Sequence, residues 1–73
     1  SPAIAMSMVT PQGEELSFFA DRAETPAEAT PLMAQRQGDT VAYWEAGSMA
    51  YALTGQADAR RVMQLAGEIA RDS

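Results

Sequence analysis

The chain contains no cysteine, no histidine and no lysine among its 73 residues. Without cysteine it cannot form a disulfide or a thiolate zinc site, so neither can stabilise a domain of this small size. The same absences remove the commonest general base, the thiol nucleophile and the amine of Schiff-base chemistry. A stable fold must therefore come from apolar burial, which a hydrophobic content of 47% permits.

Positive charge is also scarce, because five arginines face ten acidic residues and the net charge is −5. Nucleic acids and anionic membrane surfaces attract clustered cations, and the only adjacent basic pair here is Arg60-Arg61. We therefore expect neither as a direct partner. The sequence also has no apolar run near the ~20 residues of a membrane span and no signal-peptide pattern. We expect it to be a fragment of a longer protein.

Residues 3–22 predict a first antiparallel hairpin. Pro11 presets an early turn position and Gly13 can supply the left-handed residue that a three-residue hairpin loop requires. If Thr10 pairs with Glu14, six side chains fall on one face, because strand side chains alternate. These six are Ile4, Met6, Met8, Leu16, Phe18 and Ala20. We expect this face to belong to the core.

Residues 23–37 have a different pattern, with two prolines and no steady period. Pro26 and Pro31 each restrict the preceding residue to extended conformations. We predict a loop here that crosses from one hairpin to the next. A loop of this length is unusual in a small domain and is often functional.

Residues 38–55 predict a second hairpin, which holds both tyrosines and the only tryptophan. Gly47 and Ser48 fit a two-residue type II′ turn with glycine first. That turn pairs Trp44 with Tyr51 on one face of the sheet. The other members of this face are Ala42, Ala46, Met49 and Leu53.

Residues 58–71 predict a helix. Apolar residues recur there at helical spacing, and Asp58 stands where a carboxylate caps a first turn. The whole chain, residues 1–73, is then a single α+β domain. Two β-hairpins form a four-stranded antiparallel sheet, and one C-terminal helix packs on one face.

No residues have the spacing of a catalytic or metal site. Glu14 and Glu15 are adjacent in a strand, so their side chains point to opposite faces and cannot act as a pair. Calcium-loop and phosphate-loop motifs are absent. The aromatic residues Tyr43, Trp44 and Tyr51 suggest a ligand site, but cross-strand packing is the commoner reason for such a cluster. We predict that the domain is not an enzyme and takes no metal or cofactor.

A single helix covers only one face of such a sheet. Exposed apolar residues on a small domain usually mark an interface. We predict that the interaction face contains Val9, Phe19, Val41 and Tyr43. Its occupant would be another protein or a second copy.

The sequence from Gly38 onward reads GDTVAYWEAGSMAYALTGQADARRVMQLAGEIA. This pattern of strand, turn and helix resembles the C-terminal end of bacterial transmembrane anti-sigma factors. Those proteins often close with a strand that contains a glycine followed by Val-x-Tyr/Ser-Trp, a strand that contains Tyr-Ala-Leu-x-Gly, and an amphipathic helix. The matching positions are Gly38, Val41, Tyr43, Trp44, Gly47, Tyr51, Ala52, Leu53, Gly55, Leu65, Ala66 and Ile69. The first hairpin is also similar to the segment that precedes this pattern, so the resemblance covers nearly the whole chain.

In that family a cytoplasmic domain, often zinc-binding, sequesters an extracytoplasmic-function sigma factor, and a single membrane helix connects it to the C-terminal domain. The resemblance implies that this chain is a noncatalytic sensory or regulatory domain in the periplasm. It would touch the membrane only through an upstream segment and would make no direct contact with the sigma factor. No active-site residue carries over.

Two other functions remain open. One is a structural domain that forms a homodimer through the uncovered sheet face. The other is a small-ligand-binding module built around Tyr43, Trp44 and nearby carboxylates.

Overall fold

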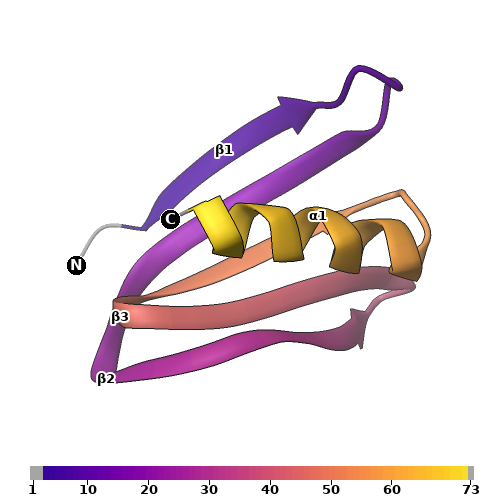
Figure 1. Ribbon diagram of the computed structural model, residues 1–73. Helices are drawn as coiled ribbons and strands as arrows, with labels where there is room; N and C mark the ends of the chain where they lie inside the picture. The colour runs from indigo at the N-terminus through magenta and orange to yellow at the C-terminus, as the bar shows by residue number, and fades with distance from the viewer. Residues whose placement is uncertain (1–2, 73) are drawn as a thin grey trace.

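The computed structural model describes residues 3–72. The order of elements is β1 (Ile4–Val9), β2 (Glu15–Arg36), β3 (Asp39–Gly55) and α1 (Ala59–Asp72) (Figure 1). The strands form one antiparallel sheet in the order β1-β2-β3. The predicted α+β class and C-terminal helix are confirmed, but the sheet has three strands instead of the predicted four.

The first hairpin has the predicted register. Its inward pairs are Ile4–Ala20, Met6–Phe18 and Met8–Leu16. At the turn, the Thr10 N–H donates to the Glu14 carbonyl (3.0 Å) and the Gly13 N–H donates to the Thr10 carbonyl (2.9 Å). Gly13 has a φ of 85°, the left-handed conformation that this turn requires.

The prediction of a loop over residues 23–37 is wrong, because β2 continues as a strand to Arg36. The hairpin turn between β2 and β3 lies at Gln37 and Gly38, whose φ values of 53° and 86° are typical of a type I′ turn. The two hairpins of the structure, β1–β2 and β2–β3, thus share one unusually long strand, β2.

Pro26 and Pro31 explain why this part of β2 looked like a loop. Each lies in one of the two register irregularities between β2 and β3, between Arg22 and Ala27 and between Ala29 and Leu32. Proline lacks an N–H for the ladder and is tolerated only at edges and bulges. This half of β2 is an edge, since β1 pairs only with the first half.

The predicted turn at Gly47 and Ser48 is also wrong, because both residues lie inside β3. Gly47 has a φ of 60° and pairs with Ala27, directly after the first irregularity in β2. The two strands bend together there, and the long hairpin folds back on itself (Figure 1).

This bend brings the two halves of β3 together. The Thr54 hydroxyl donates to the Thr40 carbonyl at 2.9 Å. The rings of Trp44 and Tyr51 stack with their centroids 5.5 Å apart. The expected aromatic neighbours are therefore correct, although a bend within one strand brings them together instead of a hairpin.

Helix α1 begins and ends one residue later than predicted. Asp58 caps it as expected, since its Oδ1 accepts from the Arg61 N–H at 2.9 Å and its carbonyl from the Val62 N–H at 3.0 Å. The helix packs against β2 and β3. The core between them consists of Leu16, Ala42, Trp44, Leu53, Val62 and Ala66.

A partly buried ion pair ties the first hairpin turn to the helix. Arg61 Nε lies 3.0 Å from both carboxylate oxygens of Glu14. Glu14 Oε1 also accepts from the Thr10 hydroxyl at 2.8 Å. Charge-assisted hydrogen bonds of this kind are stronger than neutral ones. The pair therefore fixes the start of α1 over the turn of the β1–β2 hairpin.

Candidate functional site

The predicted interaction residues are largely exposed. Val9 is 70% exposed, Tyr43 44% and Phe19 42%, while Val41 is half-buried. Strand alternation explains this, because their neighbours in sequence on the opposite face belong to the core. The structure separates these residues. Phe19 lies in the first half of the long β2/β3 hairpin (residues 16–22 and 49–55), and Val9 lies on the adjoining β1. Val41 and Tyr43 lie in the second half of the hairpin (residues 27–36 and 39–47).

The two halves have separate hollows. Val41 and Tyr43 line one of about 400 Å³ together with Ala34 and Arg36. Leu32 lies directly opposite Tyr43 across the ladder and is 53% exposed. We call Leu32, Ala34, Val41 and Tyr43 the Tyr43 patch. Phe19 lines a different and smaller hollow of about 260 Å³, between β2 and β3 in the first half of the hairpin.

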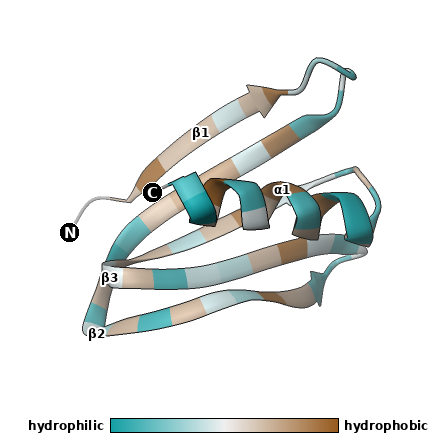
Figure 2. Cartoon of the chain, in the orientation of Figure 1, coloured by the Kyte–Doolittle hydropathy of each residue, from teal (hydrophilic) through white to brown (hydrophobic). Residues whose placement is uncertain are grey.

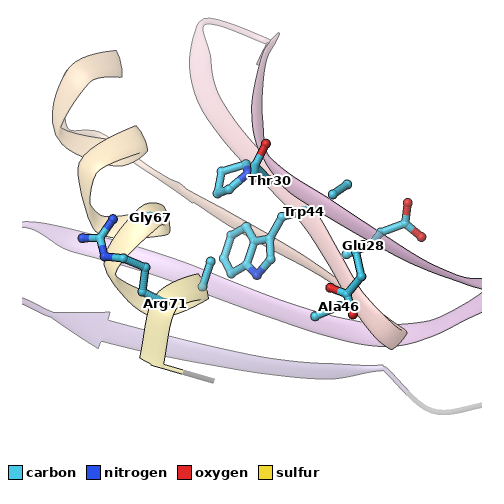
Figure 3. A pocket seen from close by; sticks show the side chains of 10 residues that line it. Glu28, Thr30, Trp44, Ala46, Gly67 and Arg71 are labelled. Carbon is cyan, nitrogen blue, oxygen red and sulfur yellow. The ribbon is translucent and has the colours of Figure 1, made fainter.

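A third hollow, of about 480 Å³, was not predicted from the sequence. It lies between the second half of the hairpin and the C-terminal part of α1. Figure 3 shows the Trp44 ring at its centre, with Gly67 and Arg71 on the helix side and Glu28 and Ala46 on the strand side. We call this the Trp44 hollow. Only the fold-back of β2 over the helix creates it, so no local pattern in the sequence indicates it.

Charged groups surround the apolar floor of the Trp44 hollow. Glu28, Glu45 and Arg71 all line it. Glu28 also has a structural role, since its Oε1 accepts from the Gly47 N–H at 3.1 Å, at the bend of β3. An apolar floor with a few polar groups is the general form of a recognition site.

The sequence also did not indicate that β1 would be a free edge of the sheet. Ile4 and Met6 were expected in the core, yet they are 55% and 52% exposed. The physical reason is the position of α1, which packs on β2 and β3 and, among residues 3–72, does not come close to β1. Figure 2 shows β1 in brown and pale colours along its length, without the strong teal of charged residues.

Within residues 3–72, no three His, Cys, Asp or Glu side chains are placed so that they could hold a metal ion. In the same range, no helix has the length and apolarity needed to cross a membrane. Comparison with known protein families, curated proteins and solved structures found no match to this chain. The features of the described chain that bear on function are therefore its exposed surfaces.

Proposed function

We propose that this chain is a noncatalytic regulatory domain of a bacterial transmembrane anti-sigma factor, on the extracytoplasmic side of the inner membrane. In this role it binds a protein partner and thereby controls how the parent protein holds its sigma factor. The observation that carries the proposal is where the residues of the family pattern lie in the fold.

Several residues of that pattern hold structurally demanding positions. Gly38 has a φ of 86° in the hairpin turn. A Cβ on Gly55 would lie 2.5 Å from Leu16 Cδ2 and 2.6 Å from the Glu15 carbonyl oxygen, so no larger residue fits. Trp44, Leu53 and Ala66 are buried in the core. The pattern thus describes a scaffold, as expected for a shared domain without a shared active site.

The Tyr43 patch is the surface that we assign to the partner. Aromatic residues and arginine are enriched at protein interfaces, and here Tyr43 and Arg36 line the same hollow. Leu32 adds a half-exposed aliphatic side chain beside them. A large aromatic side chain beside a hollow is typical of the few residues that dominate binding energy.

The test uses the full-length parent protein in its bacterium, with a reporter transcribed by the cognate sigma factor. Tyr43→Ala should change induced reporter activity by about fivefold or more, as loss of an interface anchor does. Thr25→Ala, at an exposed strand position outside the patch, is the control and should leave the reporter unchanged. Circular dichroism of both variants checks that each domain is folded.

Two results would overturn the proposal. One is a parent gene that encodes no membrane helix and no sigma-binding domain upstream of Ser1. The other is a folded Tyr43→Ala protein whose induced reporter activity matches that of Thr25→Ala.

A further inference from the structure

We propose that two copies of this chain pair edge to edge through β1, in antiparallel orientation, to form one continuous sheet. This pairing goes beyond the regulatory role proposed above and does not depend on it. It uses the edge of the sheet, whereas the Tyr43 patch lies on a face.

The free edge of β1 has unused backbone groups. Within residues 3–72, β1 pairs with β2 alone. Both backbone groups of Thr10 point toward the β2 side of the hairpin. Because this direction alternates along an antiparallel strand, the N–H and C=O groups of Ala5, Ser7 and Val9 point to the open edge.

The free edge of β1 lacks the sequence features that normally prevent an edge strand from pairing with another chain. β1 reads IAMSMV, with no charge and no proline, and its register with β2 is unbroken. On the same side of the sheet, the second half of β2 is also unaccompanied, and it carries Pro26, Pro31, Glu28 and Arg36. Charges, prolines and bulges are the usual protection of an exposed edge. The unaccompanied segment of β2 is therefore protected against pairing, whereas β1 is not.

A second copy is the occupant that β1 fits best, because the strand is self-complementary. With the two-fold axis at Met6, Ile4 lies opposite Met8 of the second copy, and Ala5 opposite Ser7 of the second copy. Large side chains then meet on the inward face and small ones on the outward face. This register also places the open-edge groups of Ala5 and Ser7 opposite each other, so their hydrogen bonds can form.

Charge also favours this contact between copies. Each chain has a net charge of −5, so two copies repel each other where acidic surfaces meet. β1 carries no charge, so the repulsion is smallest there. The contact would also cover Ile4 and Met6, the two apolar side chains of the inward face that α1 leaves exposed.

Single cysteines test the register in a chain that has no cysteine of its own. Met6→Cys should form a disulfide-linked dimer under mild oxidation, because Met6 faces itself in a non-hydrogen-bonded pair with Cα atoms about 4.5 Å apart. Ile4→Cys is the matched control, since Ile4 has the same orientation and similar exposure. Its two copies would lie about 13 Å apart and should not cross-link. Equal cross-linking of the two variants, or none, would overturn this register.

Proline tests the edge itself. Ser7→Pro removes an open-edge N–H without touching the β1–β2 ladder, so the chain should stay folded by circular dichroism. Its dimer dissociation constant, measured by sedimentation, should rise about tenfold or more, because each dimer loses two hydrogen-bond donors. Ser7→Ala keeps the N–H and should dimerise like the original chain.

The pairing is overturned if the original chain is monomeric up to about 1 mM, or if folded Ser7→Pro dimerises as well as Ser7→Ala. These results do not bear on the reporter experiment with Tyr43→Ala. The two proposals can therefore fail separately.

Discussion

The two halves of the long β2/β3 hairpin differ in how they are held. In the first half, pairing runs without interruption from Leu16 to Arg22, and β1 extends the sheet on the other side. One register irregularity separates the two halves, and a second interrupts the ladder of the second half, where β2 is an unaccompanied edge. Regular pairing supports the first half, whereas the second depends on contacts with the rest of the molecule.

Aromatic packing joins the two halves. Trp44 comes from the second half, and its ring lies 5.5 Å from Tyr51 and 6.3 Å from Phe18, both from the first. Trp44 is 3% exposed. The regular first half can therefore stabilise the irregular second half, because Phe18 and Tyr51 form an aromatic surface against which Trp44 packs.

The largest expected effect comes from removing this contact. Trp44→Ala should lower the free energy of unfolding by about 3–5 kcal/mol, because a large buried side chain leaves a cavity. Small domains have total free energies of unfolding of about 5–15 kcal/mol or less, so this substitution would remove a large part of the stability. Thermal denaturation followed by circular dichroism measures the change. Tyr43→Ala, next in sequence but exposed, should cost less than about 1 kcal/mol, and equal losses would contradict this role of Trp44.

An intermediate effect should be confined to the second half. Gly38→Ala should destabilise by about 1–2 kcal/mol, because a Cβ disfavours the left-handed conformation at the turn. Hydrogen exchange should increase most at those amides within residues 27–36 that bond to β3. Gln37→Asn should instead stabilise by a few tenths of a kcal/mol, since Asn-Gly is preferred in type I′ turns. Uniform exchange over both halves would show that they unfold as one unit.

The smallest effect concerns the first half. Glu14→Gln should cost about 1 kcal/mol, because it removes the ion pair with Arg61 while keeping the shape of the side chain. Chemical denaturation with urea at low salt gives this value, and the difference from the original chain should shrink in 1 M salt. Glu15→Gln, an exposed neighbour, is the control and should change stability by less than about 0.5 kcal/mol. A salt-independent loss would mean that Glu14 acts through its hydrogen bonds to the turn.

The surfaces were only partly predictable. Alternation along the strands identified Val9, Phe19 and Tyr43 as exposed, and they are. It could not show that Ile4 and Met6 lie beyond the reach of α1, because their inward direction is the same as that of buried Leu16. The Trp44 hollow joins strand residues to helix residues more than 20 positions away in sequence, and no local pattern contains that contact.

By itself, the sequence determined the first hairpin and the helix, because their signals are local. Thr10, Pro11 and Gly13 specify a short turn, alternating side chains set the register around it, and Asp58 caps the helix. Only the tertiary structure decided how residues 23–48 fold. Prolines suit a loop or an irregular edge strand, and a glycine with positive φ suits a turn or a bend. The choice between these depends on strand partners that are distant in sequence, and here the packing of Trp44 against Tyr51 and the helix favours a bent hairpin.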